Sequence, residues 1–386
     1  MMTRLVFRIG FWIERNNWFL YLTTIAIWSS ILLSKLLFNG LVYGFDYGLF
    51  HPDGALYSFR ALLWSGYSEF EAGKLVGEWY DTNSFKAKYE GPELYYQNNE
   101  FLWDQYSVRI LYPLLSVPFV KLFGVGGMLV IPALTYLFCL LFIMRFSIRQ
   151  NQPLLGIIVI LLVTMSTSVS RWMFANITDG LLLLFTSGLV ILISNTHDLK
   201  LSRTRCFLLL LLTIGSSLTR FSALIWIAVA LVLMIRKQFL VALLTLITSI
   251  LGLLPVFLRP FSGHVLPGYA EKSLMEKMLI YPVNLGKVTI FEIGQLFVLD
   301  RILLVLVLLT LIISLMHLRR VSSQIFLAIL VAVWLTGAIN GVLGVNFRYQ
   351  LPVIPVMMWA LIDLLPEVRK LFNANLSGKF SKSPRP

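Results

Sequence analysis

The residues best suited to chemistry gather between positions 45 and 66, in the first polar stretch that follows an apolar run. This stretch combines carboxylates, a histidine, an arginine and aromatic side chains, among them Asp46, His51, Asp53, Tyr57 and Arg60. A carboxylate beside a substrate hydroxyl can accept its proton as a general base, which typically contributes ~10²–10⁴ in rate. Asp53 or Asp46 could act as this base.

Four arginines form a second group, because each lies at the end of an apolar run away from the paired basic residues: Arg109, Arg171, Arg220 and Arg348. A guanidinium keeps its charge at all accessible pH values and binds phosphate through two donors. Near hydrocarbon an arginine costs up to ~3 kcal/mol, so it usually faces a partner or a wet cavity. Any single one is explained equally well by snorkelling to lipid headgroups. Four around one acidic loop favour a site for a lipid-linked phosphate.

The same candidates also have purely structural explanations. Asp53 lies in Pro-Asp-Gly, which suits a turn or a helix start, and Asp179 stands where a span begins and where aspartate caps helices. The further pocket candidates are Asp179, Tyr57 and Tyr349, and the lesser phosphate ligands are Arg171, Arg60 and His51. Their alternatives are a solvated loop for His51, a surface salt bridge for Arg60, packing for Tyr57 and the interfacial aromatic belt for Tyr349.

Composition places these residues in a membrane. The 386-residue chain is 58% hydrophobic and 13% charged, with a mean hydropathy of +0.80, which indicates an all-α integral membrane protein. Its net charge of +13 comes from basic pairs and triplets between apolar runs, as in cytoplasmic loops, so no nucleic-acid partner is expected. Cys139 and Cys206 lie in or beside apolar runs and indicate neither a disulfide nor a thiolate metal site. We expect no certain cofactor, and no clean acidic motif supports a divalent metal.

The positive-inside rule orders the apolar runs into about ten transmembrane helices with both termini in the cytoplasm. Ten of the nineteen acidic residues lie at 39–106, so the first loop, 39–124, is predicted outside, with interfacial helices at 54–65 and 68–79. Within it, 107–123 is predicted to be a shallow or re-entrant helix. We expect one membrane domain over 1–372, a second outer loop at 259–300 and a disordered cytoplasmic tail at 373–386. The predicted spans are 18–38, 127–144, 153–170, 179–194, 206–218, 221–235, 239–258, 302–318, 324–343 and 351–365.

Five short segments resemble the GT-C glycosyltransferases, a superfamily that includes protein O-mannosyltransferases and lipid A aminoarabinose transferases. HPDGALY at 51–57 is similar to their first outer loop, in which an acidic residue after the first span acts as the base. RILYPLL at 109–115 resembles their basic-Pro-Leu segment. The other three are TDGLL at 178–182, LTRF at 218–221 and RYQLP at 348–352. The segments occur in the family's order from residue 45 to about 355, and the chain lacks the outer carboxy-terminal domain that the family often carries.

The resemblance implies a GT-C-like fold and transfer of a sugar from a polyprenyl-phosphate donor to an envelope glycan, lipid or protein acceptor, with inversion, at the outer face of the cytoplasmic membrane. In that interpretation Asp53 is the base, and Arg109, Arg220 and Arg348 hold the donor phosphate. An O-antigen-type polymerase or ligase is the alternative enzyme. A transporter or flippase for a lipid-linked saccharide is the non-enzymatic alternative, which predicts charges at mid-membrane depth.

Overall fold

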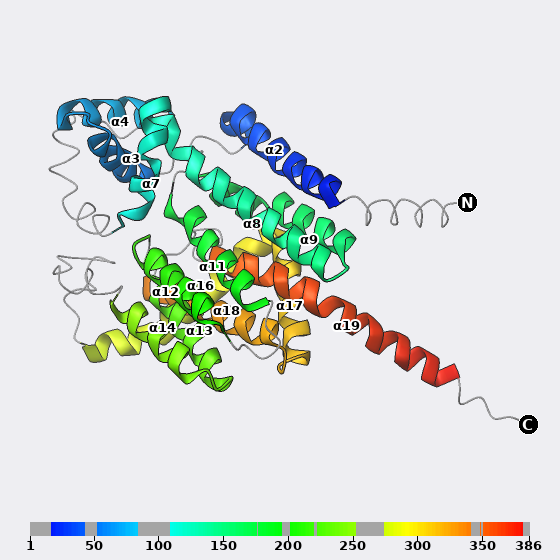
Figure 1. The fold of residues 1–386 in the computed structure, drawn as a ribbon. Coiled ribbons are helices and arrows are strands. Elements are labelled where there is room, and N and C mark those ends of the chain that lie inside the picture. The colour runs from blue at the N-terminus through cyan, green and yellow to red at the C-terminus, as the bar shows by residue number, and fades with distance from the viewer. Residues whose placement is uncertain are drawn as a thin grey trace, which may run out of the picture.

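The computed structural model of the chain is built from helices throughout the part that it describes, which comprises residues 17–42, 52–83, 109–175, 177–194, 201–219, 222–251, 274–340, 348 and 350–380 (Figure 1). In chain order the elements are α2 (Asn17–Val42), α3 (Pro52–Trp64), α4 (Glu69–Asn83), α7 (Leu111–Phe123), η2 (Gly124–Leu129), α8 (Val130–Arg149), α9 (Pro153–Met165), α10 (Thr167–Met173), α11 (Thr178–Ser194), α12 (Arg203–Ser217), α13 (Ala223–Ile235), α14 (Phe239–Leu251), α16 (Leu274–Leu299), α17 (Arg301–Met316), α18 (Val321–Asn340), η3 (Leu351–Val353) and α19 (Ile354–Phe380). The all-helical part of the predicted fold is therefore confirmed for these residues.

The centre of the bundle is formed by α11 and the first half of α19. Both are apolar around most of their circumference, which is typical of a helix that has neighbours on every side. Helix α11 packs against α8, α12 and α19, and α19 also contacts α9, α17 and α18. Residues near the start of α11 and just before α19 are thereby held deep inside the molecule.

Several helices have the length and composition to cross a membrane. Three described segments qualify, at Asn17–Leu37, Leu111–Arg149 and Leu351–Val368, and a fourth is added if α9 and α10, which meet at a 78° bend, form one broken span. Shorter apolar helices occur at Thr178–Ser194, Ala223–Ile235, Phe239–Leu251, Arg301–Met316 and Val321–Gly337. These helices are consistent with a membrane protein, and the predicted number of ten spans stays a prediction.

The chain reverses direction sharply between α7 and α8. Gly124 ends α7 with a φ of +59°, a conformation that glycine adopts without steric cost. A Cβ atom on Gly127 would overlap the backbone carbonyl of Phe119, eight residues earlier, so η2 folds back against the last turns of α7. In a straight α-helix these residues would lie about 12 Å apart. Helix α7 is therefore a separate short helix, packed against α3.

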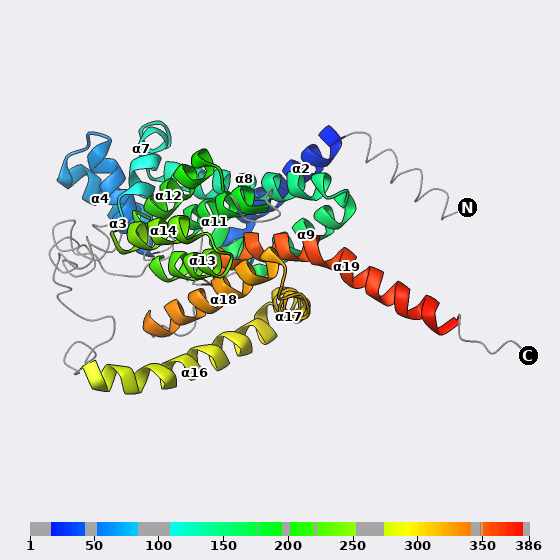
Figure 2. The same ribbon diagram turned by 60° about the horizontal axis from the view of Figure 1, so that its bottom comes forward.

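Two segments differ from expectation. The second predicted loop, 259–300, contains the 26-residue helix α16, which packs against α18 and α17 (Figure 2). Its charged residues, such as Lys287 and Glu292, interrupt the apolar run, although Glu292 is buried. The predicted disordered tail begins at residue 373, whereas α19 continues to Phe380. The sequence from 367 to 380 contains no proline that would end the helix.

The remaining helices divide between two ends of the molecule. Helices α3, α4 and α7 lie together at one end, and the last turns of α19 project from the other, as the two views show (Figures 1 and 2). Helix α3 buries Leu56, Phe59 and Leu62 against its neighbours, and α4 buries Ala72 and Val76. The predicted short helices of the first loop thus coincide with α3 and α4, which form a packed cap on the bundle.

Candidate functional site

Helix α3 carries the candidate base near its start. Asp53 is the second residue of α3, and its side chain lies outside the described residues. Tyr57 follows one helical turn later, a rise of about 6 Å along the axis. Helix α3 thus places the backbone of Asp53 one turn from Tyr57, a residue with a defined polar contact.

Tyr57 on α3 is hydrogen-bonded to Arg109, which lies two residues before the start of α7. Arg109 donates through Nη1 to the Tyr57 hydroxyl oxygen over 3.0 Å, and the Tyr57 side chain is buried whereas Arg109 is half-buried. Tyr57 also packs edge-to-face on Tyr112, with the ring centroids 5.4 Å apart. The Tyr57 hydroxyl therefore fixes the direction of the Arg109 guanidinium group.

The second pair is a buried ion pair between α11 and the turn before η3. Arg348 donates through Nε to Asp179 Oδ2 over 3.0 Å, and the two side chains are only 7% and 1% exposed. Asp179 lies in the first turn of α11, where a carboxylate is stabilised by the helix dipole. Burying two charges is costly unless they are paired, so each of these side chains depends on the other.

Two arginines share one indole ring. The guanidinium carbons of Arg171 and Arg348 each lie 5.2 Å from the ring centroid of Trp172, so no more than twice that distance separates them. Lys35 on α2 is also buried and within electrostatic range of Arg171. Arg171 and Arg348 therefore meet at Trp172, Asp179 pairs with Arg348, and Lys35 adds a third cation within electrostatic range of Arg171.

The bend between α9 and α10 positions Arg171. Ser166 at the bend caps α10 by accepting from the Val169 N–H at 3.1 Å. Asp300, at the start of α17, accepts from the Ser166 hydroxyl at 2.5 Å and from the Ser168 N–H at 2.8 Å. Because Asp300 also caps α17 through the Leu303 N–H, one buried carboxylate fixes two helix starts and, with them, the direction of α10.

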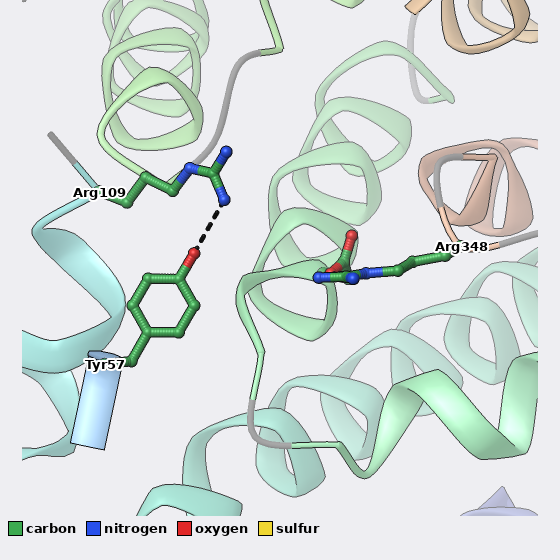
Figure 3. Close-up of polar contacts among 4 residues, drawn as sticks. Tyr57, Arg109 and Arg348 are labelled. Atoms are coloured by element: carbon green, nitrogen blue, oxygen red, sulfur yellow. Dashed lines mark hydrogen bonds and ion pairs between the residues drawn. The ribbon is translucent and has the colours of Figure 1, made fainter. Parts of the chain in front are cut away.

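Both polar pairs are anchored to one short segment. Tyr112, which packs on Tyr57, donates its hydroxyl to the Met128 carbonyl at 2.8 Å. Gly180, next to Asp179, packs so closely on Pro132 that an added Cβ would lie 3.1 Å from it. Met128 and Pro132 are four residues apart, and Figure 3 shows Tyr57 and Arg109 facing each other while Arg348 extends toward them from the other side of the view.

Arg220 is the remaining principal phosphate candidate, and it lies outside the described residues, as do Asp46, His51 and Tyr349. The Leu111 N–H donates to the Leu218 carbonyl over 3.2 Å. This bond joins the start of α7, two residues after Arg109, to the end of α12, two residues before Arg220. The backbone therefore brings the sequence neighbours of these two arginines together.

Arg60 is placed differently from the phosphate candidates. Its guanidinium carbon lies 4.7 Å above the ring of Trp64, one turn further along α3. An arginine on an aromatic ring one turn away is typical of a helix surface contact. This contact of Arg60 lies within α3 itself.

Three residues that bear on the pairs were missed by sequence reasoning, namely Lys35, Trp172 and Gln350, and so was the buried Glu292 of α16. Glu292 fell in a predicted loop. Gln350 is fully buried, and within the described parts of the chain its side-chain amide has no hydrogen-bond partner. Because a buried amide without a partner costs about 1–3 kcal/mol, it marks a place where a ligand would be stabilised. The Arg-Tyr-x-Leu-Pro segment was the one signal for it.

The arrangement can bind a polyanion but gives no sign of a metal cage in the described part of the chain. There, no group of three His, Cys, Asp or Glu side chains could hold a metal ion. Guanidinium and ammonium groups such as these can bind an anion. In comparisons with known proteins, no family model, no curated protein and no solved structure matches this chain.

Proposed function

We propose that the protein is an integral membrane glycosyltransferase of the GT-C kind, which moves a sugar from a polyprenyl-phosphate donor to an envelope glycan, lipid or protein acceptor. The observation that carries this proposal is that two arginines are each held by a buried polar partner, Arg109 by Tyr57 and Arg348 by Asp179. Arg109 on Tyr57 and Arg348 on Asp179 come from segments more than 200 residues apart, yet both pairs are anchored within one turn of the same segment at 128–132.

Each cation has a separate role in donor binding. The bond from Arg348 Nε to Asp179 fixes the direction of its guanidinium plane, and Trp172 fixes its position. Arg171 adds a second charge on the same indole. A lipid phosphate bound here would be held by charge-assisted hydrogen bonds, and its polyprenyl chain would lie between apolar helices. Arg109 would contact the phosphate from the α7 side.

The chemical step uses the phosphate as leaving group and a carboxylate as base. The acceptor hydroxyl oxygen forms a bond to the anomeric carbon while the bond from that carbon to the phosphate oxygen breaks. The electron pair of the broken bond passes to the phosphate, where the arginines stabilise the charge that develops. Asp53 accepts the hydroxyl proton, and the configuration at the anomeric carbon is inverted.

A comparison of Asp53→Asn with Glu69→Gln tests this assignment. Both changes remove one acidic side chain from the first loop, but only Asp53 is the proposed base. We expect Asp53→Asn to lower transfer by 10²-fold or more while the protein still inserts and still binds polyprenyl phosphate, and Glu69→Gln to leave transfer unchanged. Mass spectrometry of envelope glycans from cells that carry each variant gives the readout and names the missing sugar.

Full transfer by Asp53→Asn would remove the base from the proposal. A transporter or flippase would give a different pattern, because it catalyses no bond transfer. In that case purified protein with donor and acceptor would form no glycosylated product, and the unmutated protein would be as inactive as the variant.

A further inference from the structure

A second polar cluster lies at the other end of α11 from the Asp179–Arg348 pair. A cavity of about 450 Å³ opens there between the turn from α8 to α9, the end of α11, the turn from α17 to α18, and the middle of α19. Its charged lining residues are Arg236, Arg319, Arg320, Asp363 and Glu367. Ile193 also lines it, which places it about 21 Å along α11 from Asp179 at the usual helical rise.

The walls of this cavity are held by specific bonds. Arg236, at the end of α13, donates through Nε to the Gln324 side-chain oxygen over 2.8 Å and through Nη2 to the Arg319 carbonyl. Gln324 in turn donates to the Leu318 carbonyl over 2.9 Å. The turn between α17 and α18 is therefore clamped from both sides, and the backbone that carries Arg319 and Arg320 has a defined position.

The charges divide into two groups across the cavity. On one wall Arg319 is exposed and, among the described residues, its side chain makes no ion pair or hydrogen bond. Helix α18 starts two residues later at Val321, and the Asp363 carboxylate lies against its positive end through Ser322. On the opposite wall both carboxylates have partners: Asp363 accepts from the Ser322 hydroxyl at 2.6 Å, and Glu367 pairs with Arg320 at 3.5 Å. Among the charged lining residues Arg319 is thus the cation that has no partner within the described chain, and the lining carries one more positive than negative charge.

Apolar side chains next to the lining residues in sequence indicate that the ligand has a lipid tail. These apolar residues are Ile235 before Arg236, Leu318 before Arg319, and Leu154 two residues after Gln152. Their exposed fractions are 68%, 51% and 48%. Such residues are expected at the level where helices leave the hydrocarbon, and basic pockets between helix ends at that level bind lipid headgroups.

We propose that this cavity binds the phosphate of a membrane phospholipid headgroup, with Arg319 as its main ligand. Arg236 holds the turn that carries Arg319 and is a positioning residue. The acyl chains would lie against Ile235 and Leu318. This site is separate from the proposed donor site, so its occupancy and the transfer reaction are tested independently.

Lipid binding by purified protein in a phosphate-free detergent tests the proposal. The probes are phosphatidylglycerol, diacylglycerol with the same acyl chains, and inorganic phosphate, and retention is measured by native mass spectrometry. We expect retention of phosphatidylglycerol but not of diacylglycerol. Arg319→Gln should lower that retention at least about fivefold, because a charge-assisted contact to phosphate is lost. Arg319→Lys should restore part of it, since the point charge returns.

Arg203→Gln is the matched control, because Arg203 is exposed at the start of α12 but does not line the cavity. It removes the same charge and should leave retention unchanged. Equal retention by the unmutated protein and Arg319→Gln would overturn the proposal, as would equal retention of diacylglycerol. Displacement of the lipid by an equimolar amount of inorganic phosphate would assign the cavity to a soluble phosphate compound instead. Arg319→Gln should keep its polyprenyl-phosphate binding, which separates this test from that of the transferase.

Discussion

The two ends of the bundle each hold an arginine–carboxylate pair, and the pairs differ in burial. Arg348 and Asp179 are 3.0 Å apart with side chains 7% and 1% exposed, whereas Arg320 and Glu367 are 3.5 Å apart and 54% and 34% exposed. In water an ion pair gains little, because each charge is already solvated. Inside the bundle each charge has lost its water and depends on its partner. The same pair of functional groups therefore has different physical roles at the two ends.

This difference helps to separate structural from functional roles. The exposed pair can exchange partners at little cost, which suits a cavity that binds and releases a headgroup. The buried pair is costly to assemble, and a pair of apolar residues would often give equal or greater stability. Its presence beside Trp172 and Arg171 thus favours a binding role for Arg348 over a purely structural one.

The largest expected effect comes from breaking the buried pair. Arg348→Gln leaves Asp179 as an uncompensated buried charge, so we expect a loss of about 3–5 kcal/mol in the free energy of unfolding. Arg320→Gln, at the exposed pair, should cost less than about 1 kcal/mol. Unfolding in mixed micelles, followed by tryptophan fluorescence, measures both variants under the same conditions.

The double variant Asp179→Asn with Arg348→Gln sharpens the comparison. Since both charges are then removed, most of the stability lost by Arg348→Gln should return, while polyprenyl-phosphate binding should stay weak. If the double variant bound the donor as well as the unmutated protein, Arg348 would not be part of the donor site. Equal destabilisation by Arg348→Gln and Arg320→Gln would show that burial does not separate the two pairs.

The sequence predicted helices better than it predicted partners. Apolar runs locate α11, α13 and α17 within a few residues of their observed ends, because membrane-type helices are encoded by local composition. Helix α16 was missed since its charges break the apolar run, and the burial of Glu292 depends on packing against distant helices. Local composition therefore fails where a polar residue is buried by tertiary contacts.

The site shows the same limit. Arg348 and Asp179 were both candidates, but nothing in the sequence pairs two residues 169 positions apart, and the role of Trp172 beneath two guanidinium groups depends on the bend at Ser166. The capping box of α4, in contrast, was available as a local signal, because Ser68 and Glu71 have the spacing of Ser-x-x-Glu. Short-range rules reach caps and turns, whereas the convergence of cations requires the assembled bundle.

A smaller effect is expected at the Tyr57–Arg109 bond, which is intermediate in burial between the two ion pairs. Tyr57→Phe removes the hydroxyl that accepts from Arg109 and should cost about 0.5–1.5 kcal/mol. Because Arg109 then loses its orientation, polyprenyl-phosphate binding should weaken by a similar free energy. Tyr67→Phe is the control, since Tyr67 is exposed between α3 and α4. Unchanged donor affinity in Tyr57→Phe would show that Tyr57 does not position Arg109 for the donor.

The smallest expected effect is a pH-dependent loss of stability at the start of α4, which depends on the fully exposed carboxylate of Glu71. Glu71 Oε2 accepts from the Ser68 hydroxyl at 2.8 Å and from the Ser68 N–H at 3.0 Å. These bonds lower the pKa of Glu71 below its usual value of 4.5, with the bond from the Ser68 side chain as the main cause. At pH values above 4.5 the ionised Glu71 carboxylate therefore stabilises the start of α4. This contribution to stability is lost as the pH falls through the lowered pKa of Glu71.

Hydrogen exchange over residues 66–75 measures this effect as the protection of the first amides of α4. In the unmutated protein protection should be constant above the usual pKa and should fall below it, after correction for intrinsic exchange rates. Glu71→Gln can still accept from the Ser68 N–H but cannot titrate, so its protection should not change with pH. A fall in protection of the same size in both proteins would assign the pH dependence to a group other than Glu71. Because a neutral acceptor keeps the cap and removes only the titration, this pair of proteins separates the charge of the side chain from its hydrogen bond.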